Sequence, residues 1–312
     1  MNIFEKLGLK PNLNVTTYSK DQIQTKDVFG YKWNKRDSYE SEAMNKMTKK
    51  WLMQKYFNGD IDILKSILRG GGKIIVDAGC GSGYGASMLF GEMLNENYYL
   101  GIDISSSIDA AIERFKSLKL NGNFLQISLN DFEPKDESID IIFSEGVLHH
   151  TDNTENSFYH LAKKIIKGGY FIFYVYAKKA VIREFTDDFI REQLKVMSDD
   201  EAWEALYSLS KLGKSLGELN VKVNVVEDIP YLGIKKGEVD IQRFFYWNVA
   251  KLFYKDDFSL EEMNHINFDW YRPMNCHRHT AEEVMEWCVN AGFTISNITS
   301  EDSGISVVAR KD

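Results

Sequence analysis

The sequence is poor in cysteine and has no long hydrophobic run. Its three cysteines, Cys80, Cys276 and Cys288, are too few and too widely spaced for a disulfide framework, which fits a reducing compartment. The chain has no run of about 18 apolar residues, so nothing is expected to span a membrane. The first residues also lack the apolar core of a signal peptide. These absences predict a cytoplasmic protein.

The chain also lacks an excess of positive charge. Its 312 residues carry a formal net charge of −8, whereas a dedicated nucleic-acid binder usually has a basic face. We therefore expect no nucleic-acid partner. Only four prolines occur, no Pro/Ser/Gly linker divides the chain, and 44% of the residues are hydrophobic. This composition predicts one large globular domain with an elaboration.

The middle of the chain alternates between short apolar runs and helical patterns. Strands are predicted at residues 73–78, 98–104, 123–127, 139–144 and 169–176. Helices are expected after the first strand through Leu94, over 107–118 and over 154–166. This order predicts an α/β fold, a doubly wound and mostly parallel sheet with helices on both faces.

The flanking segments carry other patterns. The first 38 residues look irregular, and helices are expected over 39–57 and 61–68. Residues 178–267 read as helices rich in aromatic side chains. A capping box at Thr280 and Glu283 opens a last helix, and a hairpin is expected from residues 293–299 and 304–309.

These patterns divide the chain into four parts. The predicted parts are an N-terminal helical extension or lid (1–69), a core (70–177), a helical cap for the substrate inserted after strand five (178–267), and the last helix and strands (268–312). An insertion at the carboxyl end of a strand lies on the ligand side of an open sheet.

A glycine loop follows the first strand, in Val76-Asp77-Ala78-Gly79-Cys80-Gly81-Ser82-Gly83. Glycines let the backbone turn sharply and approach a ligand, and the helix that follows offers free N–H groups. With Ala86 and with Asp103 about 20 residues further on, the loop also satisfies the dinucleotide fingerprint. An NAD(P)-dependent oxidoreductase is therefore one interpretation.

Three features favour a different ligand. Asp77 ends the first strand, where its carboxylate would attract a cationic amine and repel a pyrophosphate. Asp103, in Gly101-Ile102-Asp103-Ile104, offers a carboxylate to ribose hydroxyls beside an apolar wall. Glu145 and a histidine pair follow the fourth strand, and Lys167-Gly168-Gly169 precedes the fifth.

Together these motifs resemble the class I S-adenosylmethionine-dependent methyltransferase superfamily. The resembling segments are the glycine loop, Gly101-Ile102-Asp103-Ile104, Asp136-Glu137-Ser138-Ile139-Asp140, Val147-Leu148-His149-His150 and Ile165-Ile166-Lys167-Gly168-Gly169. The resemblance covers about residues 70–177 and the last two strands. It implies a Rossmann-like, seven-stranded sheet whose last strand runs antiparallel, with S-adenosylmethionine bound across the carboxyl ends of strands one to four.

The resemblance also implies the cofactor-binding residues. Asp77, Gly79 and Gly81, with Cys80 and Gly83 in the same loop, match the binders of the cofactor's methionine end. Asp103 matches the ribose-binding acid, Ile104 the adenine wall, and Glu145 the residue that closes over the methionine part. Family members often place an Asp after strand three, where this chain has Ser128 followed by Leu129. Ser128 is therefore expected to contact adenine, with Asn130 or Asp131 as substitutes.

Catalysis is expected near the end of strand four. Methyl transfer from a sulfonium ion requires mainly that the acceptor be aligned, and a base helps when the acceptor is a hydroxyl. His149 and His150 lie just past this strand, and His150 is preferred as the residue that contacts or deprotonates the acceptor. Loop orientation by hydrogen bonding is the alternative role for both.

Other residues are predicted to contact the acceptor. Tyr271 and Arg272 suit a polar or anionic group, with plain packing as the alternative. Tyr176 ends strand five, and Tyr31 and Trp33 belong to an N-terminal aromatic group that acts either as a lid or as a plug. No metal site is predicted, because Cys276-His277-Arg278-His279 is too tight to wrap one tetrahedral ion.

The sequence thus predicts methyl transfer from S-adenosylmethionine, with S-adenosylhomocysteine as product, to a small polar acceptor. An oxygen atom of a sugar, a nucleotide-linked sugar or another metabolite is the expected target. The alternatives are the oxidoreductase and a non-catalytic subunit that only binds the cofactor. A monomer or a homodimer is expected.

Overall fold

In a computed structural model of the protein, the structure of residues 2–9 and 18–312 is described. Within these residues the chain forms two compact units, described separately below. Unit 1 comprises residues 2–9, 18–34, 46–177 and 275–312, and unit 2 comprises residues 35–45 and 178–274. Unit 2 thus takes in residues 35–45 from the predicted N-terminal extension and runs on to Met274, beyond the predicted cap boundary at 267.

Unit 1 is built on one sheet of seven strands in the order β3-β2-β1-β4-β5-β9-β8. The first five strands in the chain are parallel, and β9 runs antiparallel to both of its neighbours. The strands are β1 (Ile74–Ala78), β2 (Tyr98–Asp103), β3 (Asn123–Gln126), β4 (Ile139–Glu145), β5 (Ile165–Tyr176), β8 (Phe293–Ser300) and β9 (Gly304–Lys311). The predicted α/β fold and the predicted C-terminal hairpin are confirmed.

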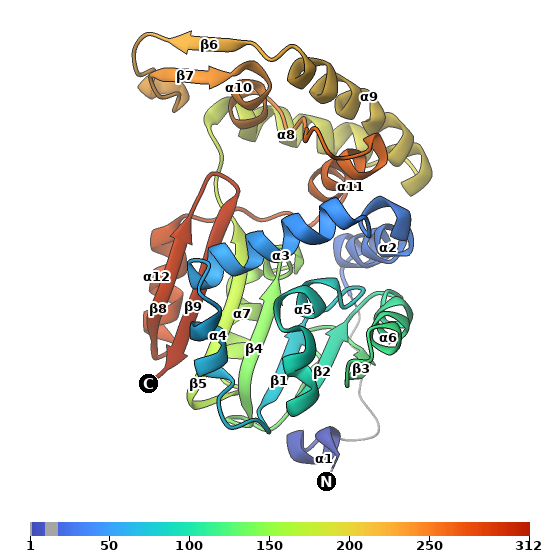
Figure 1. The fold of residues 1–312 in the computed structure, drawn as a ribbon, viewed down its shortest axis with the longest axis vertical. Helices are drawn as coiled ribbons and strands as arrows, with labels where there is room; N and C mark the ends of the chain where they lie inside the picture. The colour runs from blue at the N-terminus through green and yellow to red at the C-terminus, as the bar shows by residue number, and fades with distance from the viewer. Residues whose placement is uncertain (1, 10–17) are drawn as a thin grey trace. The chain divides into compact units, whose positions relative to one another are not determined.

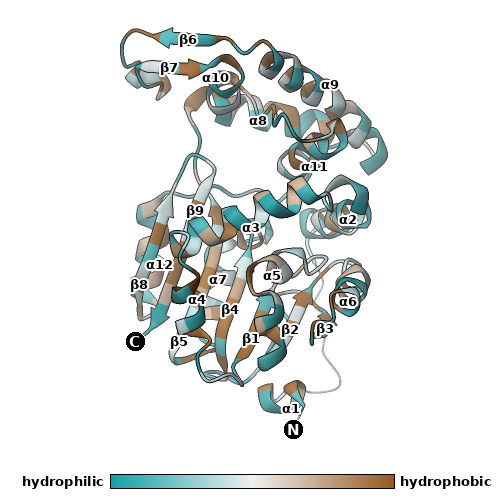
Figure 2. Cartoon of the chain, viewed as in Figure 1, coloured by the Kyte–Doolittle hydropathy of each residue, from teal (hydrophilic) through white to brown (hydrophobic). Residues whose placement is uncertain are grey.

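The central strands are mainly hydrophobic, as expected for a parallel sheet that is covered on both faces. Figure 2 shows apolar residues gathered on β1, β4 and β5. In Figure 1, α3, α4 and α5 lie on one face, and α7 and α12 lie on the other. The helices of unit 1 are α1 (Ile3–Leu7), α2 (Lys20–Asn34), most of α3 (Glu42–Phe57), α4 (Ile61–Ile67), α5 (Tyr84–Leu89), α6 (Ile108–Ser117), α7 (Thr154–Ala162) and α12 (Ala281–Asn290).

Two expectations about helices in unit 1 are wrong. The first 38 residues are not irregular, because they contain α2. The side chains that α2 buries include Gln22, Thr25, Val28 and Lys32, so its inner face is mainly polar and gives no apolar periodicity. The helix after the glycine loop ends at Leu89 rather than Leu94, and a 3-10 helix over residues 91–96 replaces its last turns.

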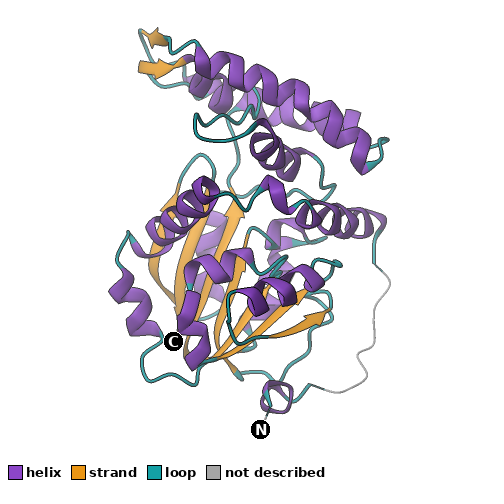
Figure 3. Ribbon diagram, turned by 45° about the vertical axis from the view of Figure 1, so that its right-hand side comes forward, coloured by secondary structure: helices purple, strands orange, loops and turns teal. Residues whose placement is uncertain are grey.

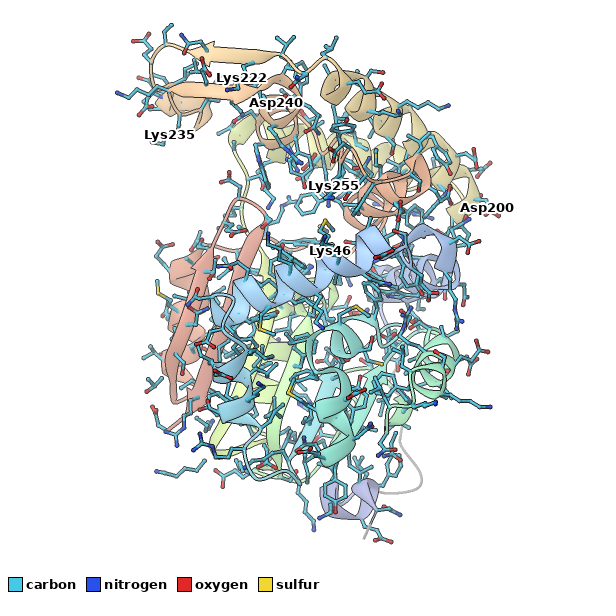
Figure 4. The ribbon with its side chains drawn as sticks, in the orientation of Figure 1. Lys46, Asp200, Lys222, Lys235, Asp240 and Lys255 are labelled. Atoms are coloured by element: carbon cyan, nitrogen blue, oxygen red, sulfur yellow. The ribbon has the colours of Figure 1, made fainter. Side chains whose placement is uncertain are left out.

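Unit 2 is mainly helical, as Figure 3 shows by colour. Its helices after residue 177 are α8 (Val181–Leu194), α9 (Asp199–Glu218), α10 (Ile241–Asn248) and α11 (Leu260–Tyr271). The prediction of helices alone is wrong, because β6 (Lys222–Val225) and β7 (Gly237–Asp240) pair antiparallel. Lys222 faces Asp240 in the register of this pair, and Figure 4 labels both residues on the hairpin. The alternation of Val221, Val223 and Val225 was the available signal for a strand.

Candidate functional site

The glycine loop joins β1 to α5 at the carboxyl edge of the sheet. Gly79 has a φ of +86°, and a Cβ there would lie 2.3 Å from the side chain of Val147. Only glycine accepts both the positive φ and this close approach. The buried hydroxyl of Ser82 has no hydrogen-bond partner within the described parts of the chain. A polar ligand bound at this loop would satisfy it.

Asp77 is buried at the end of β1, as predicted for a carboxylate facing the loop. The hydroxyl of Tyr99 on β2 donates a hydrogen bond of 2.7 Å to its Oδ2. Burial raises the pKa of Asp77 to about 7, while the Tyr99 hydrogen bond lowers it and the charges of Asp103 and Glu145 raise it further. A cation at this position would therefore be met by a carboxylate that ionises near neutral pH.

Asp103 ties the end of β2 to the glycine loop. Its Oδ2 accepts a hydrogen bond of 2.8 Å from the Gly81 N–H, and its Oδ1 accepts from the N–H and the hydroxyl of Ser105. Burial raises the pKa of Asp103, and these hydrogen bonds oppose the rise. Ile104 follows at the same edge and is half-buried. The Asp103 carboxylate thus links the glycine loop to the segment that follows β2.

The segment after β3 brings four predicted residues to the neighbouring position of the edge. Ser128 and Leu129 are both buried. The amide oxygen of Asn130 accepts from the Ser157 hydroxyl, and Asp131 accepts from the Tyr18 hydroxyl at 2.9 Å. Burial and the Asp131 interaction raise the pKa of Tyr18 to about 12. Asn130 and Asp131 are thus engaged with the protein, and the Ser128 hydroxyl also accepts a hydrogen bond of 3.3 Å from the Asn130 N–H.

Glu145 ends β4 and is held by two residues that the sequence analysis missed. Lys55 Nζ lies 2.5 Å from its Oε1, and the hydroxyl of Tyr56 donates to its Oε2. Both partners come from α3, about 90 positions away in the sequence. A lysine on the buried face of α3, next to Leu52 and Tyr56, was the one available signal.

His149 and His150 are buried directly after β4. The ring of His149 lies against Tyr176 on β5, with centroids 3.7 Å apart and planes 31° apart. His150 Nδ1 lies 2.6 Å from the backbone oxygen of Asn275, and Phe29 of α2 packs edge-on against the His150 ring. The structure therefore brings the histidine pair, Tyr176 and α2 together in unit 1.

α2 runs along this edge of the sheet. The backbone N–H of Asn275 donates to the Thr25 hydroxyl. A Cβ on Gly30 would lie 2.9 Å from the hydroxyl oxygen of Ser106, just after β2. Trp33 lies at the glycine loop, because a Cβ on Gly81 would meet its Nε1 at 2.6 Å. Tyr31 is half-buried on the same helix. Of the two predicted aromatic contacts, Trp33 therefore lies against the glycine loop.

Tyr271 and Arg272 lie in unit 2 and bind other residues of that unit. The Tyr271 hydroxyl donates to Asp187 and accepts from the Lys251 N–H. Arg272 donates to Asp199 and to the backbone oxygen of Met197. These contacts stabilise unit 2.

Two further findings concern metals and membranes. Within residues 2–9 and 18–312, no group of three or more His, Cys, Asp or Glu side chains could hold a metal ion. The backbone of the Cys276–His279 segment lies beside the end of β5, where the His279 N–H donates to the Tyr176 oxygen and the His277 N–H donates to the His149 oxygen. Among the helices described, none is long and apolar enough to cross a membrane.

Comparisons with known proteins agree with this geometry. Residues 70–221 match the family described as "Methyltransferase domain". The solved magnesium protoporphyrin IX methyltransferase from Synechocystis PCC 6803, with bound S-adenosylhomocysteine, is 13% identical with a TM-score of 0.51, over 94% of this chain and 100% of its own. The (4+2)-cyclase SpnF is 11% identical with a TM-score of 0.50, over 97% and 99%. A comparison with curated protein sequences gives no match.

At such low sequence identities, the similarity to solved structures establishes the fold alone. The family match supports methyl transfer as the reaction. The protein is an enzyme built on a Rossmann-like sheet. Residues 70–221 carry a methyltransferase domain, which supports the class I S-adenosylmethionine-dependent methyltransferase superfamily, and S-adenosylmethionine is the cofactor. The oxidoreductase interpretation of the loop is therefore wrong.

Proposed function

We propose that the enzyme transfers a methyl group from S-adenosylmethionine to an oxygen atom of a small polar acceptor, with His150 as general base. A sugar, a nucleotide-linked sugar or another metabolite is the proposed class of acceptor. When bound, the cofactor supplies an activated methyl group on a sulfonium ion. The protein's part is then to align the acceptor and to take up its proton.

The contact between His150 and Asn275 carries the proposal of a base. A backbone carbonyl can only accept a hydrogen bond, so Nδ1 of His150 holds the proton and Nε2 is the basic nitrogen of the neutral ring. The contact thus selects the tautomer in which Nε2 can accept a proton. His149, with its ring against Tyr176, is proposed as part of an aromatic wall beside it.

The burial of the histidines supports a small acceptor. His149 and His150 are 0% and 4% exposed, and α2 packs against them through Phe29. A polymer would need an open groove, and the net charge of −8 disfavours nucleic acid. We propose that the enzyme acts in the cytoplasm, as a monomer or homodimer, with no nucleic-acid partner.

We propose that the residues at the carboxyl edge of β1 to β4 bind the cofactor. Asp77, Gly79, Cys80, Gly81 and Gly83 would hold the methionine end together with Glu145. Asp103, Ile104, Ser128 and Leu129 would hold the adenosine end. Trp33 is proposed to cover the loop, while Tyr31 and the inserted cap stay predictions as acceptor contacts. Tyr271 and Arg272 also stay predictions as acceptor contacts, although Tyr271 donates to Asp187 and Arg272 to Asp199 within unit 2.

The test is a labelled-methyl screen of fractionated cell metabolites with the purified enzyme. Label is expected in a small molecule that releases it as an O-methyl group. Label found only in protein or nucleic acid would contradict the small acceptor. Binding of S-adenosylhomocysteine without any transfer would contradict catalysis.

The role of His150 is tested with the product of that screen. His150→Asn keeps an amide donor for the Asn275 carbonyl but removes the base, so kcat is expected to fall roughly 100-fold or more. The affinity for S-adenosylhomocysteine should be unchanged. A kcat within threefold of the wild type would show that His150 is not the base.

A further inference from the structure

Lys55 is a lysine buried inside unit 1, where lysines are seldom found. Its side chain is 3% exposed, and Nζ lies 3.4 Å from the ring centroid of Trp51, 4.1 Å from that of Tyr174 and 4.8 Å from that of Tyr56. Aromatic ring faces attract cations through their quadrupole. The three rings therefore form a cage that suits an ammonium group.

The remaining partner of this ammonium group is Glu145. The ion pair of 2.5 Å and the Tyr56 hydrogen bond engage both carboxylate oxygens from one helix, α3. The backbone oxygen of Lys55 accepts from Asn297 and Thr299 on β8, which fixes this part of α3 against the sheet. Glu145 is thus held by Lys55 and Tyr56, and β8 fixes the part of α3 that carries these two residues.

Glu145 lies next to the glycine loop, so the contacts of Lys55 and Tyr56 with it bear on the cofactor site. A Cβ on Gly85 would lie 3.8 Å from Glu145 Cγ, so the carboxylate stands beside the start of α5, directly after the glycine loop. Only 17% of its side chain is exposed. Glu145 lies on β4, and Asp103, the proposed ribose ligand, lies two strands away on β2. Glu145 therefore belongs to the methionine end of the site.

The charges around Lys55 explain why a cation is kept there. Burial lowers the pKa of Lys55 to about 8, and the charges of Glu145 and Glu301 oppose this, so the group is largely protonated at neutral pH. Asp77 and Asp103 also lie at this edge of the sheet, and the charge of Glu145 raises the pKa of Asp77. By pairing with Glu145, the Lys55 ammonium offsets part of the negative charge of these three carboxylates.

We propose that Lys55 is a positioning residue of the cofactor site, which holds the Glu145 carboxylate in the orientation that binds the amino-acid end of S-adenosylmethionine. Lys55 acts through Glu145, and Trp51 and Tyr174 hold Lys55. The proposal rests on the assignment of Glu145 to the methionine end. It adds a residue from α3 to the site formed by the sheet, its loops and α2.

The experiment measures two ligands by calorimetry on the full chain. S-adenosylhomocysteine carries the amino-acid end, and 5′-methylthioadenosine lacks it. Lys55→Met, which keeps the length of the side chain, is expected to weaken S-adenosylhomocysteine at least tenfold and to leave 5′-methylthioadenosine within twofold. A merely structural role would weaken both ligands alike, and that result, or unchanged affinity for both, would overturn the proposal.

A second pair of variants shows whether Lys55 acts through Glu145. Glu145→Gln is expected to weaken S-adenosylhomocysteine at least tenfold, and adding Lys55→Met to it should change the affinity by less than twofold. A further tenfold loss in the double variant would overturn the proposal. The double variant carries no unpaired buried charge, so where either single variant fails to fold it is compared with the wild type instead, and its affinity for S-adenosylhomocysteine is expected to be at least tenfold weaker.

The same data separate this inference from the assignment it rests on. Wild-type affinity for Glu145→Gln would remove the assignment of Glu145 to the amino-acid end, and the positioning role with it. Loss of affinity in Glu145→Gln but not in Lys55→Met would leave the assignment and remove only the role of Lys55.

Discussion

Trp33 Nε1 lies 2.6 Å from the position that a Cβ on Gly81 would occupy. Trp33 is near the end of α2, and Gly81 is in the glycine loop, so the helix covers the loop by close contact. Gly81 has a φ of +52°, and its N–H donates to Asp103. One glycine therefore joins the covering helix, the loop and the proposed ribose ligand.

Gly81→Ala is expected to damage this junction. The new Cβ meets Trp33, and the positive φ costs an alanine about 1 kcal/mol. We expect the affinity for S-adenosylhomocysteine to fall at least tenfold in a calorimetric titration. Gly85→Ala is the matched control, because Gly85 lies in α5 and its nearest Cβ contact is an ordinary 3.6 Å. Equal affinities for the two variants would contradict the close approach.

The binding of S-adenosylhomocysteine should tighten as the pH rises from 6 to 8. Its cationic amine prefers the ionised form of Asp77, whose pKa burial raises to about 7. The affinity is expected to change by up to about tenfold, with a proton released on binding. Calorimetry in buffers of different ionisation enthalpy would measure that proton.

Two variants control this pH profile. Asp77→Asn should bind weakly with a flat profile. Tyr99→Phe removes a hydrogen bond that lowers the pKa of Asp77, so its midpoint should move to higher pH. A wild-type profile that matches Asp77→Asn would show that Asp77 does not titrate in this range.

The burial of Lys55 should also appear in the stability of the ligand-free enzyme. Its pKa is lowered from 10.5 in the unfolded chain to about 8 in the folded protein, so the unfolded chain binds more protons between these values. The free energy of unfolding should therefore rise with pH in this window, by up to about 1.4 kcal/mol per pH unit. Denaturant unfolding between pH 8 and 9.5 would measure the rise against Lys55→Met. Parallel curves for the two proteins would mean that Lys55 titrates like an exposed lysine.

Unit 2 should depend on the buried carboxylate of Asp187. It accepts hydrogen bonds from Arg183, from Trp270 Nε1 at 2.8 Å and from the Tyr271 hydroxyl at 2.8 Å. Asp187→Asn leaves the Arg183 charge buried without its partner, which is expected to cost about 3–5 kcal/mol. Hydrogen exchange should then speed up in α8 and α11.

The control for this variant lies on the same helix. Asp188 is half-exposed and pairs with Arg191, so Asp188→Asn is expected to cost less than about 0.5 kcal/mol. Similar exchange in both variants would contradict the structural role of Asp187.

Much of the cofactor loop could be predicted because its residues are close together in the chain. Strand, glycine turn and helix lie within a few residues of one another, so Asp77, Gly79 and Gly81 take their places through local geometry. Asp103 could be placed as well, because the carboxyl ends of parallel strands meet at one edge. Apolar runs of strand length then predicted the parallel sheet itself.

The missed features depend on contacts between distant residues. α2 buries a mainly polar face, which periodicity does not detect, and β6 and β7 are too short to outweigh the helical pattern around them. The partners of Glu145 lie about 90 positions away on α3, and the carbonyl that holds His150 lies 125 positions away. No local pattern links such pairs.

The methyl donor could therefore be inferred from the order of residues along the chain, because a glycine loop between carboxylates is a local arrangement. The charge and the tautomer of the side chains around that loop could not be inferred in this way. Whether Lys55 is a surface cation or a buried partner of Glu145, and which nitrogen of His150 is basic, depend on packing that joins residues far apart in sequence. Burial and hydrogen bonding set the charge and tautomer of such groups, and both arise only when the chain has folded.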